Sequence, residues 1–211
     1  PDLLEVVVPN YPPGAKRMIR DNGVWARALK RDNVRLVTTG IREITPRGIV
    51  TVDGTAHDVD VIIYGTGFTA SKFLAPMKVT GRGGVDLHEH WQGEPRAYLG
   101  ITVPGFPNLF CLYGPNTNIV INGSIIYFSE CGVRYILGLI EMALREGKRA
   151  VDVRREVHDR FNEEVDRANE HMAWGASDVN SWYKNASGRV SQNWPFTLLE
   201  YWQRTLRPDP D

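Results

Sequence analysis

The spacing of apolar residues along the chain changes several times, and each change predicts a different element. Residues 124–146 carry apolar side chains every three to five positions, the spacing of one helix face. Ser124 can cap this helix and Gly147 can end it. A second helix is predicted for about residues 154–173, whose apolar stripe is Val157, Phe161, Val165, Ala168 and Met172.

The first thirty residues predict a rigid turn followed by a short helix. Residues 9–14, PNYPPG, form the turn, because proline fixes φ and disfavours helix at the residue before it. Asp21 or Asn22 can cap the helix, whose apolar side is Val24, Trp25, Ala28 and Leu29.

Alternating apolar and polar residues predict strands between residues 34 and 65. DNVRLVTTG, residues 32–40, alternates like a strand. Three more strands follow, joined by the turn signals Pro46-Arg47-Gly48 and Asp53-Gly54. We therefore expect a β-meander that ends in a buried strand at DVDVIIYG, residues 58–65.

The remainder of the chain has weaker periodicity. Residues 69–107 are rich in glycine and proline and predict loops, and NLFCLYGP, residues 108–115, predicts another buried strand. The tail, residues 174–202, has little predicted regular structure. Its four tryptophans favour packing, although one of them could line a pocket: Trp174, Trp182, Trp194 and Trp202.

Composition narrows the class of protein. The 211 residues are 42% hydrophobic and include 25 basic and 25 acidic side chains, typical of a soluble globular protein with no polycationic surface for nucleic acid. Cys111 and Cys131 lie in no CxxC or zinc spacing, so we expect buried, reduced thiols in a cytoplasmic protein. The longest apolar run, residues 135–144, contains Glu141 and is far shorter than the roughly 20 residues of a membrane span.

The sequence begins at Pro1, without a methionine, and continues as if from a preceding segment. We expect it to be the C-terminal part of a longer protein.

Three stretches are candidates for chemistry. Gly65-Thr66-Gly67-Phe68 follows an apolar strand, and its glycines either turn the chain or let backbone approach a nucleotide or a second domain. Lys16-Arg17 is either a solvated surface pair or a fixed anion site, with lysine as a point charge and arginine as a planar fork. Asn122-Gly123-Ser124 begins the long helix, and Ser124 is either a simple cap or part of an anion-binding helix N-terminus.

Other chemistries have little support. His88 and His90 could place two imidazoles on one strand face, but no third ligand has a matching spacing, so no metal site is predicted. No arrangement of a nucleophile with histidine and carboxylate is evident, and no carboxylate pair stands out. Simple hydrolysis is therefore disfavoured.

In combination, several stretches resemble the C-terminal half of Baeyer–Villiger flavin monooxygenases. They are YPPGAKRMIRDNG, DVDVIIYGTGF, YLGITVPGFPNLFCLYGPN and NGSIIYFSEC, in this order. The tail MAWGASDVNSWYKNASGRVSQNWPFTLLEYW is most similar to the 4-hydroxyacetophenone monooxygenase branch. The resemblance covers essentially the whole chain. One departure is Tyr64, where the family often has alanine.

The resemblance implies a fold and a division of the chain. The fold class is α/β, the C-terminal part of a flavoprotein with two dinucleotide-binding domains of the Rossmann type. Residues 1–67 would complete the NADP-binding domain, residues 68–150 would return to the FAD-binding domain, and residues 151–211 would form a helix and a Trp-rich tail. Gly65 to Phe68 would then be a hinge close to both cofactors.

The resemblance also implies an activity and residue roles. NADPH would reduce FAD, and one oxygen atom of O2 would be inserted into a ketone, such as an aryl ketone, to give an ester. Arg17 matches the catalytic arginine, a fixed cation for the developing negative charge. Lys16 matches the residue that reaches the 2′-phosphate of NADP, and Trp182 a tryptophan near that cofactor. Asn122, Gly123 and Ser124 match flavin contacts.

Several alternatives and partners stay open at this point. A related flavin oxygenase acting on nitrogen or sulfur has the same architecture, and a non-catalytic binding module is the alternative from another class. A homodimer is possible, whereas nucleic acid and membrane are not expected as partners. By itself this part of the protein is not expected to be active.

Overall fold

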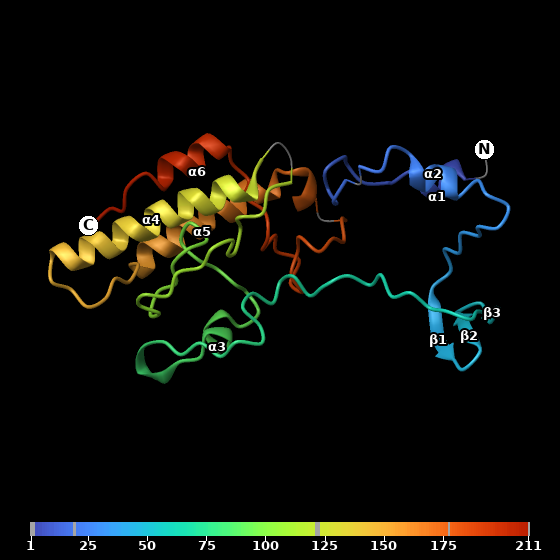
Figure 1. The fold of residues 1–211 in the computed structure, drawn as a ribbon, viewed down its shortest axis with the longest axis horizontal. Coiled ribbons are helices and arrows are strands. Elements are labelled where there is room, and N and C mark those ends of the chain that lie inside the picture. The colour runs from blue at the N-terminus through green and yellow to red at the C-terminus, as the bar shows by residue number, and fades with distance from the viewer. Residues whose placement is uncertain (1–2, 19, 121–122, 177, 211) are drawn as a thin grey trace. The chain divides into compact units, whose positions relative to one another are not determined.

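The computed structural model describes residues 3–18, 20–120, 123–176 and 178–210, which form two compact units. The smaller unit is Ile19–Phe68, and the larger unit joins Pro1–Met18 to Thr69–Asp211. Figure 1 shows the helices and strands of both units along the chain.

The smaller unit contains one short helix, α2 (Val24–Ala28), just after the predicted capping residues. The Asp21 carboxylate accepts hydrogen bonds from the backbone N–H groups of Gly23 at 3.0 Å and Trp25 at 2.7 Å. These bonds to the ionised form lower the pKa of Asp21. An acidic side chain thus satisfies N–H groups that have no partner inside the helix, as the sequence predicted.

A three-stranded antiparallel sheet forms the rest of this unit. Its strands, in the order β1-β2-β3, are Ile41–Thr45, Gly48–Thr51 and Ala56–Asp58. The turn between β2 and β3 is fixed by Asp53, whose carboxylate accepts from the N–H of Thr55 at 3.0 Å. Three strands after residue 40, separated by the two predicted turns, are therefore confirmed.

Two other strand predictions in this unit are wrong. Residues 34–39 form no strand, and within the described residues β3 stops at Asp58 instead of continuing to residue 65. Val61 and Ile63 are 74% and 90% exposed, so the expected buried strand is neither paired nor buried. Alternation marks a segment that suits a sheet, but a strand exists only where a neighbour supplies hydrogen-bond partners.

The larger unit is built from helices and extended segments. Its described residues contain no strand beyond single bridges between residue pairs. Its helices and 3₁₀ turns are α1 (Leu4–Val7), η1 (Arg82–Gly84), α3 (Leu87–Trp91), α4 (Ile125–Arg145), α5 (Arg155–Glu170), η2 (Ala173–Gly175) and α6 (Leu198–Arg204). The strand predicted at residues 108–115 is therefore wrong. A backbone bond from Cys111 N–H to the Ile101 carbonyl, 2.8 Å, joins this extended segment to its neighbour.

Both long helices confirm the sequence prediction, and α4 does so down to its ends. Ser124 is its N-cap, with Oγ accepting from the N–H of Tyr127 at 3.3 Å. At the other end Gly147 adopts φ 65°, and the N–H groups of Gly147 and Lys148 bond the carbonyls of Leu144 and Ala143. This is a Schellman motif, which needs glycine at the left-handed position.

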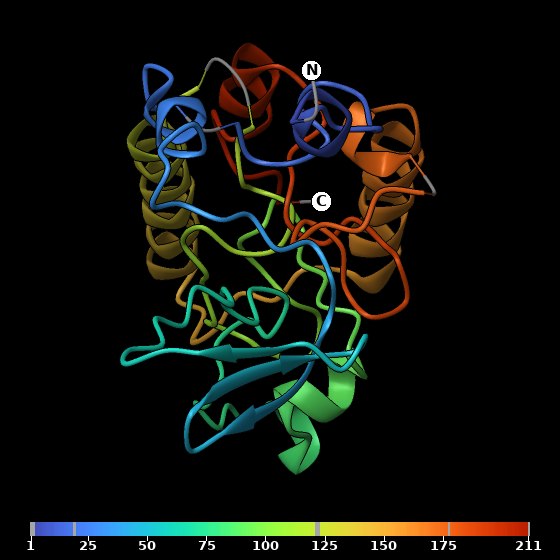
Figure 2. The same cartoon turned by 90° about the vertical axis from the view of Figure 1, so that its right-hand side faces the viewer.

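The main core lies between α4 and α5. In Figure 2 the yellow α4 and the orange α5 stand on opposite sides of extended segments. Phe128 from α4 stacks on Tyr201 from α6, with ring centroids 4.0 Å apart, and Trp194 packs edge-on against both rings. The other buried members of this core are Leu99, Ile101, Cys131, Tyr135, Leu139, Phe161 and Val165.

A second core surrounds α3, which carries both candidate metal-binding histidines. These residues form a helix and not the strand expected for them. Asp86 caps it by accepting from the N–H groups of His88 and Glu89. The His88 ring lies 3.1 Å from the Met77 carbonyl, and the His90 ring packs edge-on against Phe106. Among the described residues no three potential ligands gather around a metal position.

The tail tryptophans divide into packed and accessible ones. Trp174 and Trp194 are buried, and Trp202 lies in α6, an element that the sequence did not predict. Trp182, at 42%, is the exposed one. The prediction that most of these tryptophans pack is confirmed, and Trp182 is the one free to meet a ligand.

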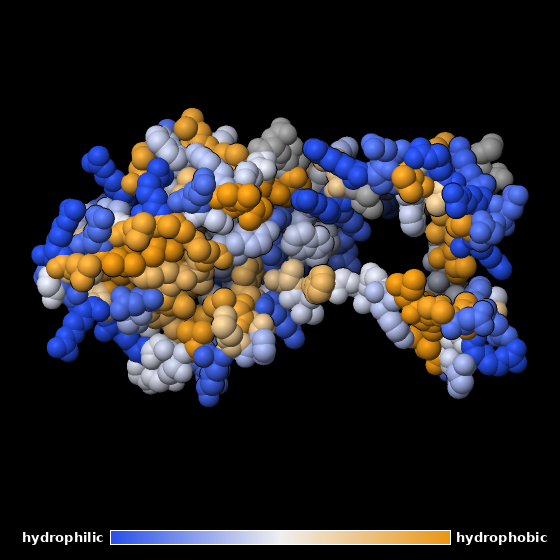
Figure 3. Space-filling model, viewed as in Figure 1, coloured by the Kyte–Doolittle hydropathy of each residue, from blue (hydrophilic) through white to orange (hydrophobic). Residues whose placement is uncertain are grey.

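The face of α4 that points away from the main core is also apolar. Figure 3 shows a hydrophobic area over this helix, and its exposed apolar residues are Ile125, Ile126, Val133, Leu137, Ile140 and Leu144. A helix that is apolar around most of its circumference is typical of one packed on both sides. Within the described residues, no helix has the length and hydrophobicity that spanning a membrane would require.

Both cysteines are free and buried, as expected, and this predicts their reactivity. Burial raises the pKa of the Cys111 thiol to about 11, so little reactive thiolate is present near neutral pH. We predict that Ellman's reagent at about pH 8 labels neither Cys111 nor Cys131 in the native protein, and labels both after unfolding in guanidinium. Rapid labelling of the native protein would contradict the buried position.

Candidate functional site

Lys16 and Arg17 follow directly on a turn that is anchored in the larger unit. The N–H of Ala15 bonds the Pro12 carbonyl at 3.1 Å, and Ala15 is completely buried. The Lys16 ammonium lies over the Tyr11 ring, 4.7 Å from its centroid. Arg17 is exposed and makes no hydrogen bond to any residue that the structure describes. The pair is therefore held at its backbone, while the Arg17 guanidinium stays available.

Two tyrosines lie near the Arg17 guanidinium. Burial raises the pKa of Tyr113 and of Tyr183, and the positive charge of Arg17 opposes that shift in both. Both phenols are therefore protonated near neutral pH and can donate a hydrogen bond beside the cation.

The two phenols differ in their partners. Tyr113 Oη donates to Asn118 Oδ1 at 2.7 Å, and Asn118 Nδ2 donates to Asn193 Oδ1 at 2.6 Å. The side chain of Tyr183 is completely buried, and its Oη has no hydrogen-bond partner among the described residues. A buried hydroxyl without a partner is costly and therefore notable.

Trp182 belongs to the same group of side chains. Its ring contacts that of Tyr183, with centroids 4.5 Å apart. Arg17 and Trp182 were predicted separately, from opposite ends of the sequence. Tyr183, which was not predicted, relates them, because its ring contacts Trp182 and its phenol is affected by the charge of Arg17.

Two segments far apart in sequence support these aromatic residues. The N–H groups of Asn116 and Asn118 bond the carbonyls of Ser191 and Gln192 at 3.0 and 2.8 Å, and the Trp194 N–H bonds the Asn118 carbonyl at 2.9 Å. Residues 116–118 therefore run beside residues 191–194. Tyr113 precedes the first segment, and Tyr183 precedes the second.

The N-terminus of α4 is the other predicted site in this unit. Gly123 and Ser124 are exposed, and the N–H groups of Ile125 and Ile126 bond no described residue. A Cβ at Gly123 would lie 2.3 Å from the Ile119 side chain, so this approach requires glycine. Free N–H groups at a positive helix end suit an acceptor-rich ring edge or a phosphate, so the donor set fits a flavin. Asn122 lies outside the described residues.

Gly65 to Phe68 end the smaller unit in an extended segment. Phe68 is 96% exposed, and a Cβ at Gly65 or Gly67 would meet no atom within 4 Å. Close packing of the chain therefore does not explain these glycines. The requirement at Gly67 is conformational, because its φ of 84° is one that other residues rarely adopt.

The sequence did not reveal the two tyrosines near Arg17 or the asparagine that one of them bonds. Tyr113, Asn118 and Tyr183 belong to no short motif, and they meet only because two segments about 70 positions apart lie side by side. The unpaired Tyr183 hydroxyl in particular has no signature in the sequence.

Comparison with known proteins shows what the whole chain is similar to. No protein-family model matches the chain. It is 38% identical over 196 residues to a Baeyer–Villiger monooxygenase of Pseudomonas aeruginosa, covering 92% of this chain and 37% of that protein. It is 37% identical over 205 residues to the FAD-binding monooxygenase ktnD of Aspergillus niger, covering 95% and 33%.

A solved structure, oxidized steroid monooxygenase bound to NADP, matches with a TM-score of 0.82 and 31% identity. The match covers 98% of this chain and 39% of the other. The chain is a relative of the Baeyer–Villiger monooxygenases. The chain spans only about a third of the length of the curated proteins it matches. Its fold is the α/β fold expected from the sequence, part of that of an FAD- and NADP-binding flavoprotein.

The different partners of the two phenols predict opposite effects on stability. Tyr113→Phe leaves the buried Asn118 oxygen without its donor, so we expect the free energy of unfolding to fall by about 1 kcal/mol. Tyr183→Phe removes a hydroxyl that has no described partner, so the same quantity should stay unchanged or rise. Denaturant titration of both variants checks this, and equal losses would show that Tyr183 Oη is bonded.

Proposed function

We propose that the full-length protein is an FAD- and NADPH-dependent Baeyer–Villiger monooxygenase. It would insert one oxygen atom of O2 into a ketone and release an ester. When bound, FAD supplies the redox chemistry, since it accepts a hydride from NADPH and activates O2. The observation that carries the proposal is the exposed Arg17 guanidinium, which bonds no described residue and whose charge acts on the phenols of Tyr113 and Tyr183, in a chain similar to monooxygenases over nearly all of its length.

Arg17 is proposed as the catalytic residue. Oxygen transfer to a ketone builds negative charge on the carbonyl oxygen, and a fixed cation stabilises that charge more than it stabilises the neutral substrate. The buried turn at Ala15 holds the backbone of Arg17, and the neighbouring phenols are neutral donors that do not cancel its charge.

Lys16 and Trp182 are proposed to bind NADPH. An ammonium held over the Tyr11 ring is a point charge suited to the 2′-phosphate, which distinguishes NADPH from NADH. Trp182 offers an exposed ring whose N–H can donate to the same cofactor.

The FAD contacts are proposed at the start of α4. Asn122, Gly123 and Ser124, with the free N–H groups that follow, would face the flavin ring. Gly65, Thr66, Gly67 and Phe68 are proposed as a hinge beside both cofactors, supported by the left-handed φ of Gly67 and by family resemblance.

The division into residues 1–67, 68–150 and 151–211 stays a proposal on the same grounds. The exposed apolar residues of α4 and the apolar segment after β3 are proposed to pack against other parts of the full-length protein.

An aryl ketone, such as 4-hydroxyacetophenone, is the proposed substrate, and this rests on the resemblance of the tail alone. Product analysis of the full-length enzyme with an aryl ketone and with a thioether distinguishes the two functions. An ester from the ketone supports Baeyer–Villiger oxygenation, whereas a sulfoxide alone supports sulfur oxygenation. A homodimer and a cytoplasmic location stay predictions.

Arg17→Ala should separate cofactor reduction from oxygen transfer in the full-length enzyme. We predict that NADPH still reduces the flavin at the normal rate in stopped-flow absorbance, while ester formation falls by about a hundredfold or more. Arg145→Ala, which removes a surface ion pair with Glu141, is the matched control and should leave both rates unchanged. Undiminished ester formation in Arg17→Ala would refute the catalytic role.

Lys16→Ala should weaken NADPH selectively. We expect its binding to lose about 1.5–3 kcal/mol, the usual worth of a hydrogen bond to a charged group, while NADH binding hardly changes. Lys16→Arg keeps the positive charge and should retain most of the preference. Measured dissociation constants for both cofactors decide the matter, because an equal loss for NADPH and NADH would rule out recognition of the 2′-phosphate.

A further inference from the structure

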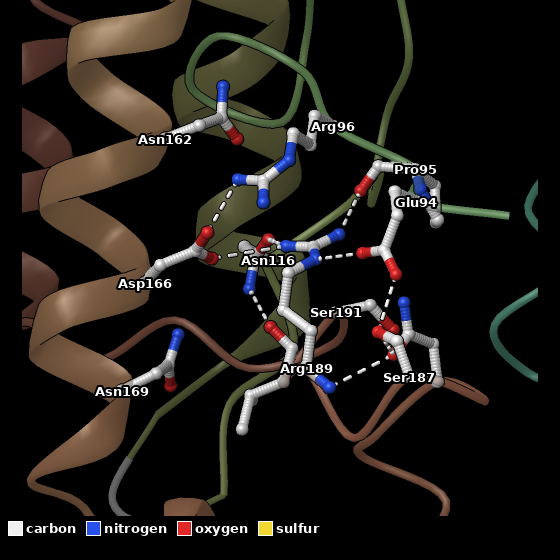
Figure 4. Close-up of polar contacts among 12 residues, drawn as sticks. Glu94, Pro95, Arg96, Asn116, Asn162, Asp166, Asn169, Ser187, Arg189 and Ser191 are labelled. Atoms are coloured by element: carbon white, nitrogen blue, oxygen red, sulfur yellow. Dashed lines mark hydrogen bonds and ion pairs between the residues drawn. The ribbon is translucent and has the colours of Figure 1, made fainter. Parts of the chain in front are cut away.

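A partly buried cluster of two cations and two carboxylates contacts the segments that follow Tyr113 and Tyr183. Figure 4 shows Arg189 at its centre, between Glu94 and Asp166. The Arg189 side chain is only 11% exposed and donates to Glu94 Oε2 at 2.7 Å and to Asp166 Oδ1 at 3.2 Å. Arg96 donates to the other Asp166 oxygen at 2.6 Å, so the charges balance.

The Arg189 fork also bonds neutral groups. It donates to the Pro95 carbonyl and, at 3.4 Å, to Asn116 Oδ1. Asn116 Nδ2 in turn donates to the carbonyls of Val190 and Asn193 at 2.8 and 3.2 Å. One guanidinium therefore links the loop before residue 97, helix α5 and the segment 116–118 to the end of its own hairpin.

The hairpin of Arg189 is the one that carries Trp182 and Tyr183. The Asn185 N–H bonds the Arg189 carbonyl at 2.9 Å, and the Ser191 N–H bonds the Tyr183 carbonyl at 3.0 Å. Ser187 Oγ at the hairpin tip donates to Glu94, the same carboxylate that Arg189 binds. Burial alone would raise the pKa of Glu94, but the hydrogen bonds from Ser187 and Arg189 outweigh it, and the net pKa is lowered. Glu94 is thus ionised and holds the tip and the second arm of the hairpin.

We propose that Arg189 is a positioning residue, which fixes the hairpin of residues 182–191 against the segment of residues 113–118, so that Trp182, Tyr183 and Tyr113 keep their places beside Arg17. This inference rests on the proposed function. Arg189 itself touches none of these side chains. It acts through Asn116 and the hairpin backbone.

The chemistry of the cluster favours positioning over stability. A buried ion pair often contributes little net stability, because removing the charges from water offsets their attraction. A planar fork that bonds four oxygens in different directions does, however, allow one arrangement of the segments that carry them. Lysine at this position could keep the charge but not the directions.

A second cluster on α5 provides a matched control. Arg204 bonds both oxygens of Glu164 at 2.9 and 2.6 Å and also Glu200. It packs over the Phe196 ring and joins α5 to α6, and it bonds neither residues 113–118 nor the hairpin. Arg204→Met and Arg189→Met thus each remove a fork from an α5 carboxylate, but only the second affects the proposed site.

The test uses the full-length holoenzyme. For Arg189→Met we expect the dissociation constant of NADP+ to rise by about tenfold and the ester formed per NADPH oxidised to fall by a similar factor. In Arg204→Met, the dissociation constant of NADP+ and the ester formed per NADPH oxidised should both stay within about twofold of the parent. This should hold even if the melting temperature of Arg204→Met falls as much as that of Arg189→Met. Equal effects of the two variants, or no change in NADP+ affinity in Arg189→Met, would overturn the inference.

A double variant separates positioning from folding. In Arg189→Met alone, the Glu94 carboxylate has lost its cation. Adding Glu94→Gln removes that unpaired charge, so the melting temperature of the double variant should recover toward that of the parent. NADP+ affinity should stay low, because the fork is still missing. Recovery of affinity together with melting temperature would make the role purely structural. NADP+ binding is measurable whether or not an ester forms, so failure of the proposed reaction in the parent enzyme is a separate result.

Discussion

The hydrogen bonds between residues 116–118 and residues 190–194 are the constraint on which the larger unit depends. Its described residues contain no extended sheet, so buried backbone groups need partners of another kind. Asn116 Nδ2 supplies two of them by donating to the carbonyls of Val190 and Asn193. The Asn118 amide accepts from Tyr113 Oη and donates to Asn193 Oδ1, which ties the two segments together a second time. These bonds join a segment in the middle of the chain to one near its end, and they hold in place the segments that carry Tyr113 and Tyr183.

Helix packing and electrostatics reinforce this connection from two sides. Aromatic rings from α4 and α6 meet Trp194, the last residue of the paired segment. On the α5 side, Arg189 and Arg204 attach two different regions to one helix through carboxylates. The apolar contacts contribute most of the stabilisation, since burial of large rings is worth several kcal/mol. The charged contacts contribute little net energy and instead fix geometry.

The chain spans little more than a third of its curated relatives, and α4 and residues 59–68 expose apolar side chains. Lys16, Arg17, Trp182 and Ser124 all lie in the larger unit and are at least partly exposed, as the proposed cofactor contacts require. The physical argument for the proposed reaction thus rests on an exposed cation whose backbone is held, near two neutral phenols, and on similarity to flavin monooxygenases.

The sequence by itself determined what depends on neighbours in the chain. Helices α4 and α5, the Ser124 cap, the Asp53-Gly54 turn and the Lys16-Arg17 pair after its proline turn all follow from residues a few positions apart. Tertiary structure decided the rest. Residues 34–39, 59–65 and 108–115 have strand-like patterns but formed no strand, because a strand needs a partner that no local pattern supplies. The cluster around Arg189 joins residues 95 positions apart by hydrogen bonds, and the setting of Arg17 includes Tyr183, near the other end of the chain. Only the folded chain brings such residues together.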